Sequence, residues 1–181
     1  MLIAANSDRR ITPAAAAAIR LLVLDVDGVM TDGRLHFDAD GRESKVFHVR
    51  DGYGIKQALR CGIELVVISG RRSKAAEVRM RDLGIAHLRF GRDDKLAAFQ
   101  ELNAELQIPL PEIACMGDDV PDLELMQAAG VAIAVADAHP RVLAAADWCT
   151  RLAGGRGAVR EVCDFIVAAR REHAADRSGS A

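Results

Sequence analysis

Aromatic side chains are scarce in this chain of 181 residues: only 4% of the residues are Phe, Trp or Tyr, although 50% are hydrophobic. Aliphatic side chains must therefore fill the interior, and the length suits one domain with a substantial core. An excess of one charge is also missing, since the formal net charge is −2. A general nucleic-acid-binding protein carries a basic face, so this balance argues against that class.

Zinc-ligand pairs and long apolar runs are missing as well. The four cysteines form no Cys-x-x-Cys pair and lie in or beside apolar segments, which predicts buried, reduced thiols. The five histidines are equally scattered, so we expect no zinc site. No apolar stretch approaches the ~20 residues of a membrane span, and the alanine run at 14–18 is too short for a signal-peptide core. We therefore expect a cytoplasmic protein with no membrane partner.

Strand and helix patterns alternate along the chain, and this alternation predicts an α/β fold. We expect a Rossmann-like parallel sheet with helices on both faces, in a single domain over residues 1–173. The predicted strands are about 20–26, 63–68, 87–90, 113–116, 131–135 and 148–150, and the main predicted helices are about 52–61, 73–83, 95–106, 121–129 and 158–173. The small and polar residues from 174 to 181 predict a disordered tail.

One segment departs from the alternation. Residues 34–48 contain two short alternating runs around Asp40-Gly41, a pattern typical of a β-hairpin. This hairpin follows directly on the first strand, so we expect it to lie over or beside whatever the end of that strand binds.

Polar side chains follow several of the predicted strands. Asp25 and Asp27 end the first apolar strand, Ser69 ends the second, Asp118 follows a later one, and Lys95 opens a helix. In an open α/β sheet the carboxyl ends of parallel strands meet at one edge, where ligands bind. Carboxylates at such a place are rarely buried unless paired or metal-bound, and hard oxygen ligands suit magnesium rather than zinc.

These residue types also suit chemistry on a phosphate group. Asp25 could attack phosphorus and form an aspartyl-phosphate, and Asp27 could protonate the leaving oxygen and later deprotonate water. Ser69 and Lys95 could hold phosphoryl oxygens, while magnesium and Lys95 offset the charge on the transferring group.

Four segments in this order resemble the motifs of haloacid-dehalogenase-superfamily phosphatases: residues 25–31, residues 68–71, Lys95 and residues 117–122. Further segments are similar to a family within it, the 3-deoxy-D-manno-octulosonate (KDO) 8-phosphate phosphatases, and extend the resemblance over nearly the whole chain. These segments are residues 49–54, 134–140 and 153–164.

The resemblance implies a capless, magnesium-dependent phosphatase of a sugar-acid phosphate in lipopolysaccharide biosynthesis. It implies a homotetramer in which each hairpin borders a neighbour's active site. By resemblance, Asp25 is the nucleophile, Asp27 the acid/base, and Ser69 and Lys95 the phosphoryl-oxygen donors. Asp25, Asp118 and the backbone carbonyl of Asp27 resemble the magnesium ligands.

Further residues are candidates for binding the sugar-acid substrate, since arginine in particular suits bidentate recognition of a carboxylate. Together with Asp27 and Lys95 they are His48, Val49, Arg50, Asp51, Gly52, Lys56, Gly70, Arg71, Arg79 and Arg156. Lone arginines are usually solvated surface residues, and Arg79 could serve a neighbouring subunit instead. His48 replaces an asparagine expected by resemblance, so contact there could be through the backbone. Asp119 and Asp122 could either touch the site or cap a helix.

The sequence leaves three alternatives open. The substrate could be a related nine-carbon sugar-acid 9-phosphate, with the same fold and catalysis. The chain could be a receiver-like phospho-acceptor, although that class places a lone acceptor aspartate after a middle strand, where Ser69 stands here. It could also be a catalytically silent relative that only binds, but every motif residue is present.

Overall fold

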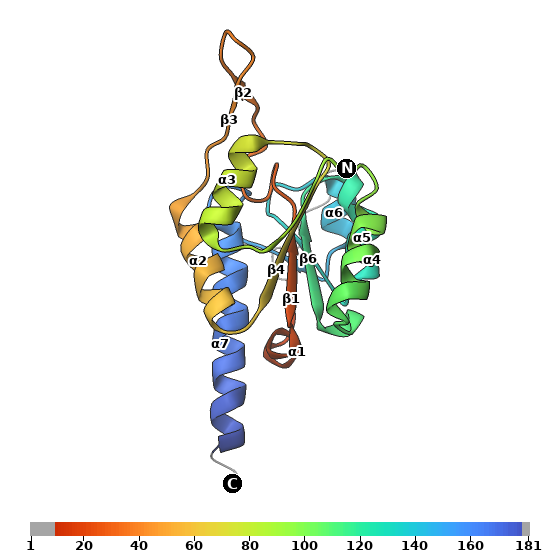
Figure 1. The fold of residues 1–181 in the computed structure, drawn as a ribbon. Coiled ribbons are helices and arrows are strands. Elements are labelled where there is room, and N and C mark those ends of the chain that lie inside the picture. The colour runs from red at the N-terminus through yellow and green to blue at the C-terminus, as the bar shows by residue number, and fades with distance from the viewer. Residues whose placement is uncertain (1–9, 179–181) are drawn as a thin grey trace.

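A six-stranded parallel sheet forms the centre of the protein in a computed structural model, which describes residues 10–178 (Figure 1). The strand order is β5-β4-β1-β6-β7-β8. The strands are β1 (Leu21–Leu24), β4 (Glu64–Ser69), β5 (His87–Phe90), β6 (Ile113–Gly117), β7 (Val131–Ala134) and β8 (Trp148–Cys149). The predicted fold class is thereby confirmed.

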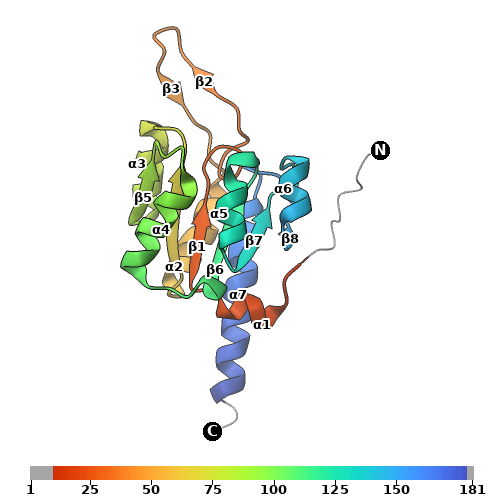
Figure 2. The same cartoon turned by 90° about the vertical axis from the view of Figure 1, so that its right-hand side faces the viewer.

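Helices cover both faces of this sheet. The helices are α1 (Pro13–Ala18), α2 (Val49–Arg60), α3 (Lys74–Leu83), α4 (Lys95–Leu106), α5 (Leu123–Ala128), α6 (Pro140–Ala145) and α7 (Ala158–Ser178), with short 3-10 turns at Leu110–Glu112 and Val120–Asp122. Figures 1 and 2 show α2, α3 and α7 on one face and α4, α5 and α6 on the other. None of these helices is both long and apolar enough to cross a membrane.

The central strand β1 is buried along its whole length, as its unbroken apolar sequence predicts. It pairs in parallel with β4 on one side and β6 on the other, with Leu24 opposite Val67 and Met116. The carboxyl ends of β1, β4 and β6 therefore lie side by side, and the residues that follow them are brought to the same edge of the sheet.

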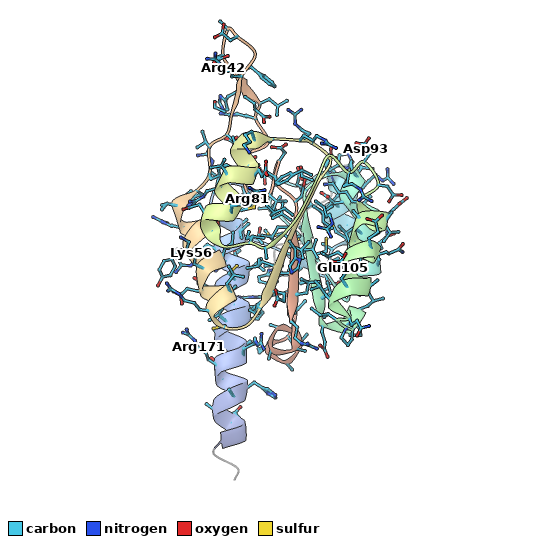
Figure 3. The ribbon with its side chains drawn as sticks, in the orientation of Figure 1. Arg42, Lys56, Arg81, Asp93, Glu105 and Arg171 are labelled. Atoms are coloured by element: carbon cyan, nitrogen blue, oxygen red, sulfur yellow. The ribbon has the colours of Figure 1, made fainter. Side chains whose placement is uncertain are left out.

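The predicted hairpin is present at that edge. Its strands β2 (His36–Phe37) and β3 (Glu43–Ser44) are short and antiparallel, and the turn between them contains Gly41 with φ +75°. Figure 2 shows the hairpin projecting beyond the carboxyl ends of the sheet strands. Arg42 lies near its tip (Figure 3).

Two helix boundaries differ from the prediction. Helix α2 begins at Val49 rather than near residue 52, because His48 caps it by accepting the N–H of Arg50. Helix α7 runs to Ser178, five residues beyond the predicted end of the last helix at 173 and into the predicted tail, of which residues 179–181 lie outside the described residues. The last part of α7 extends past the amino-terminal edge of the sheet (Figure 1).

The cysteine prediction is confirmed in most respects. Cys115, Cys149 and Cys163 are buried and Cys61 is partly exposed, and in the described part of the chain none of the four is in a disulfide. Burial raises the pKa of Cys115 and Cys163, which keeps these thiols protonated and unreactive.

Candidate active site

A cavity of about 520 Å³ opens at the carboxyl edge of the sheet. Its lining residues are Asp25, Asp27, Gly33, Ser69, Gly70, Arg71, Asp93, Lys95, Asp118, Asp119, Pro121 and Asp122. Asp93 marks this end of the molecule in Figure 3, whereas Glu105 lies farther along α4. The folded chain thus brings the predicted motif residues of β1, β4, α4 and β6 together around one space.

Three carboxylates gather within this cavity. One oxygen from each of Asp25, Asp118 and Asp122 lies within 4.8 Å of the others, an arrangement that could hold a metal ion. Gly28 has φ +84°, and a Cβ built on it would lie 1.9 Å from Asp118 Oδ2. Only glycine therefore allows the loop after β1 to pass so close to the carboxylate that follows β6.

Burial and mutual repulsion disfavour the ionised forms of Asp25 and Asp118. Burial and then the nearby Asp122 raise the pKa of Asp25 to about 7, although Lys95 works against this shift. Burial, followed by repulsion from Asp25 and Asp122, raises the pKa of Asp118 to about 8. A cation placed among the three oxygens would remove much of this cost, so the donor set fits a divalent ion.

Lys95 is the buried cation of the cavity. Its Nζ lies 2.6 Å from Asp122 Oδ1 and 3.0 Å from Asp25 Oδ1. Burial disfavours the ammonium charge, but the attraction of Asp25 and Asp122 outweighs burial and raises the Lys95 pKa. Lys95 is the first residue of α4, where the helix dipole disfavours a cation, and these two carboxylates explain why it stays charged there.

Asp122 and Asp119 have different surroundings. Besides Lys95, Asp122 accepts the backbone N–H groups of Asp118 and Asp119, so it ties the loop after β6 to α4. Asp119 lines the cavity and also caps the following 3-10 turn by accepting the N–H of Val120. The contact between Asp122 and Lys95 was not predicted from the sequence, because no spacing or periodicity indicates it.

Asp27 is flanked by two cations. Lys45, from the hairpin, contacts Asp27 Oδ1, and Nε of Arg71 lies 3.4 Å from Asp27 Oδ2. Glu43 pairs with both cations, with Oε1 2.9 Å from Arg71 Nη2 and 3.4 Å from Lys45 Nζ. Burial works against the charge of Glu43, but hydrogen bonds from Ser73 and Arg71 prevail and lower its pKa. Sequence reasoning singled out Arg71 but missed Lys45 and Glu43.

Ser69 takes the place expected of it at the end of β4. It is buried, lines the cavity and accepts the N–H of Arg71 through Oγ at 3.4 Å. This bond leaves the hydroxyl hydrogen available to another acceptor, such as a phosphoryl oxygen. Gly70 and Arg71 line the cavity beside it.

The other substrate-binding candidates are not among the residues that line this cavity. Arg50 and Arg156 instead line a second cavity, of about 430 Å³, near the start of α7. Val49 is 77% exposed, and Lys56 points outward from α2 (Figure 3). Arg79 pairs with Asp82 at 2.8 Å.

Three of the remaining candidates have structural contacts. His48 caps α2, and Gly52 leaves room for Arg79, since a Cβ there would lie 2.3 Å from Arg79 Nη2. Asp51 is buried and accepts the backbone N–H of Arg160 at 2.8 Å, so it fixes α2 to the first turn of α7.

The glycine-rich turn before α7 packs directly on the loop after β1. Gly155 donates its N–H to the carbonyl of Val29 at 2.9 Å, and Gly154 donates to Asp137 Oδ1 at 2.9 Å. A Cβ on Gly154 would lie 1.6 Å from the carbonyl oxygen of Gly28. The turn therefore supports the loop that begins with Asp25 and Asp27.

Comparison with known proteins agrees with this geometry. Residues 91–161 match the family model of haloacid dehalogenase-like hydrolases. The chain is 51% identical over 156 residues to the Escherichia coli KDO 8-phosphate phosphatase KdsC, covering 86% of this chain and 83% of that protein. The crystal structure of the Yersinia pestis KDO 8-phosphate phosphatase superposes with a TM-score of 0.86 at 50% identity, over 88% of this chain and 86% of that one.

A further solved structure carries ligands. The Moraxella catarrhalis KDO 8-phosphate phosphatase, in complex with magnesium, phosphate and KDO, has a TM-score of 0.86 and 38% identity, over 93% of this chain and 97% of that one. Residues 10–178 form a parallel sheet with an acidic centre at its carboxyl edge and contain no cap domain, and with the family match they define a capless haloacid dehalogenase-like hydrolase. Within that class, the chain belongs to the KDO 8-phosphate phosphatase family.

Proposed function

We propose that this protein hydrolyses KDO 8-phosphate to KDO and phosphate with Mg²⁺, and so serves lipopolysaccharide biosynthesis. The observation that carries the proposal is the meeting of Asp25, Asp118 and Lys95 in one cavity, in a chain half identical to enzymes of this name. The Moraxella relative, which holds magnesium, phosphate and KDO, supports both the cofactor and the substrate.

Two carboxylates of the acidic cluster and one backbone carbonyl would supply protein ligands for Mg²⁺. Asp25, Asp118 and the backbone carbonyl of Asp27 would hold the ion, because the oxygens of Asp122 already meet Lys95 and two backbone N–H groups. Bound Mg²⁺ offsets negative charge on the transferring phosphoryl group. Lys95 adds a fixed positive charge beside Asp25, and Ser69 offers a hydroxyl donor at the end of β4.

The reaction then runs in two displacements. A carboxylate oxygen of Asp25 bonds to phosphorus while the bond to the sugar oxygen breaks, and Asp27 gives its proton to that oxygen. A water oxygen next bonds to phosphorus, the bond to Asp25 breaks, and Asp27 takes one proton from the water. The first step yields free KDO and the second yields phosphate, so the enzyme returns to its starting state.

Arg71 is our leading candidate for binding the sugar-acid carboxylate. It lines the cavity, and its side chain remains 44% exposed despite its contacts with Asp27 and Glu43. Its planar guanidinium suits two parallel hydrogen bonds to a carboxylate. We assign Arg79, Arg50, Arg156 and Lys56, which lie away from the cavity of their own subunit, to contacts with a neighbouring subunit or its substrate.

We infer a cytoplasmic homotetramer in which each hairpin borders a neighbour's cavity. Exposed apolar side chains on the hairpin and the following helix support an interface there, since Phe37 is 57% exposed and Val46, Val49 and Tyr53 are exposed as well. Val46→Asp should therefore reduce the assembled mass in sedimentation. Leu110→Asp, at the opposite edge of the sheet, is the matched control and should leave the mass unchanged. An unchanged assembled mass for both variants would contradict this interface.

Phosphate release is the direct test of the activity. The purified protein, with Mg²⁺, should release phosphate from KDO 8-phosphate much faster than from common sugar phosphates that lack a carboxylate, and excess chelator should stop the reaction. A nine-carbon sugar-acid 9-phosphate is the second substrate to compare. No release from KDO 8-phosphate in the presence of Mg²⁺ would refute the proposal.

A further inference from the structure

Lys45 has surroundings that its place on a projecting hairpin does not lead one to expect. Its side chain is only 1% exposed, although neighbouring residues of the hairpin are exposed. Lysine is almost never buried without partners, and its charge here meets Asp27 Oδ1 and Glu43 Oε1. The buried ion pair between Lys45 and Asp27 therefore joins the hairpin to the loop after β1, where the residues of the reaction centre lie.

The two oxygens of Asp27 face different groups. Oδ1 meets Lys45, which does not line the cavity, and lies 3.5 Å from the hydroxyl of Thr31. Oδ2 lies toward Arg71, which does line the cavity. Oδ1 is thus held by Lys45, whereas Oδ2 is buried and has no hydrogen-bond partner among the described residues, which leaves it free to carry a proton.

We propose that Lys45 is a positioning residue for the phosphatase reaction, which holds Oδ1 of Asp27 so that Oδ2 carries the proton to and from the reacting groups. This inference rests on the acid/base role proposed above for Asp27. An ammonium group has only donors, so Lys45 can donate to Oδ1 whether Asp27 is ionised or carries a proton on Oδ2. A proton on Oδ1 would instead point at the ammonium, which is unfavourable.

Glu43 completes the arrangement. Its carboxylate meets both Lys45 and Arg71, so it fixes the spacing of the two cations that flank Asp27. Glu43 belongs to β3 and Lys45 follows that strand directly. The base of the hairpin is therefore set against the reaction centre, and the orientation of Asp27 depends on it.

The test uses two substrates that differ in their need for a proton. The alkoxide that leaves a sugar phosphate requires protonation, whereas the nitrophenolate that leaves p-nitrophenyl phosphate is stable without it. Lys45→Met should lower kcat/KM for KDO 8-phosphate about 10- to 100-fold and kcat/KM for p-nitrophenyl phosphate less than about 3-fold. This ratio is the one to compare, because it covers the steps up to departure of the leaving group and excludes the hydrolysis of the aspartyl-phosphate that both substrates share. Lys45→Arg should restore most of the loss, since it keeps the charge and the donors.

Two further variants keep the result interpretable. Lys74→Met is the matched control, because Lys74 is an exposed lysine that pairs with Glu77 at the surface, and its kinetics should equal those of the native protein. Lys45→Gln, which retains a donor without the charge, should show the same substrate asymmetry with a smaller loss. Thermal unfolding of each variant establishes that it is folded before its kinetics are compared.

Asp27→Asn separates this inference from the function on which it rests. Asp27→Asn should also lower kcat/KM more for KDO 8-phosphate than for p-nitrophenyl phosphate, and the difference should be larger than in Lys45→Met. Suppose that Asp27→Asn lowers kcat/KM mainly for the sugar phosphate. Equal losses of kcat/KM on both substrates in Lys45→Met, or no loss on either, would then overturn the role of Lys45 alone. Equal losses in Asp27→Asn would overturn the acid/base assignment, and with it the positioning role.

Discussion

The reaction centre and the rim around it are built in contrasting ways. The centre consists of buried side chains at the ends of β1, β4 and β6, where Asp25, Lys95 and Asp122 are fixed by one another and by the sheet. The rim consists of the hairpin, the loop after β4 that contains Arg71, and the first turns of α2 and α3, and several of its charged and apolar side chains remain exposed. The charged groups of the centre thus pair with one another within the chain, whereas many side chains of the rim remain accessible to a partner or a ligand.

The largest expected effect comes from breaking the centre. Asp25→Asn should lower kcat for phosphate release by at least about a thousandfold, because the amide cannot form the acyl phosphate. The fold should be retained, since the change removes one of three crowded negative charges. Phosphate-release kinetics and thermal unfolding check the two parts. Activity within tenfold of the native level would rule out Asp25 as the nucleophile.

Metal removal should give the next largest effect, and one that depends on pH. The folded-state pKa values of Asp25, about 7, and Asp118, about 8, lie above the ordinary value of 3.8. Their ionisation therefore costs stability, and metal-free protein should lose stability as pH rises from about 4 to 8. Mg²⁺ binds the ionised forms, so its stabilising effect should grow over the same range.

Thermal unfolding with Mg²⁺ and with chelator, at several pH values, measures this difference. An excess of Mg²⁺ a hundredfold above its Kd stabilises by about 2.7 kcal/mol. A gap between the two conditions that is constant from pH 5 to pH 8 would show that these carboxylates do not hold the ion.

A smaller effect should come from the support beneath the centre. Gly154→Ala would place a methyl group against the carbonyl of Gly28, and we expect a loss of about 1–3 kcal/mol in stability together with lower kcat. Gly41→Ala on the hairpin is the control, because a Cβ there has no atom within 4 Å. Its positive φ costs about 1 kcal/mol, but activity should not change. Unaltered kcat in Gly154→Ala would mean that the turn does not support the loop.

The rim should give the smallest change, and one confined to substrate binding. Arg71→Ala should raise KM for KDO 8-phosphate about tenfold, the cost of a lost charge-assisted hydrogen bond, and leave KM for p-nitrophenyl phosphate nearly unchanged. Arg42→Ala at the hairpin tip, where Arg42 pairs with Asp38 and Asp40, is the matched control. Equal effects of Arg71→Ala on both substrates would place Arg71 with the centre instead.

The sequence predicted the centre better than the rim, for a physical reason. Asp25 and Asp27 follow an apolar strand that has to be buried, so their place at the edge of the sheet follows from local pattern alone. The contact of Lys95 with Asp122 joins residues 27 apart, and that of Lys45 with Asp27 joins residues 18 apart. Both contacts depend on how separate elements pack against one another, and a hydrophobic periodicity does not indicate this packing.

Helix boundaries were missed for related reasons. Histidine is not among the favoured N-cap residues, so nothing in the pattern marked His48 as the start of α2. The last turns of α7 are exposed from Arg171 to Asp176 and show no apolar face, although alanine there favours a helix. In both places the local chemistry, rather than a hydrophobic pattern, sets the end of the element.

The choice between two sugar acids tests the account most directly. The native protein, with Mg²⁺, would be given KDO 8-phosphate and a nine-carbon sugar-acid 9-phosphate in one competition assay, and the consumption of each would be followed. We predict that kcat/KM favours KDO 8-phosphate by at least about tenfold, because the chain is 51% identical to an enzyme of that name. Equal consumption, or preference for the nine-carbon substrate, would contradict the proposal that this protein is a KDO 8-phosphate phosphatase.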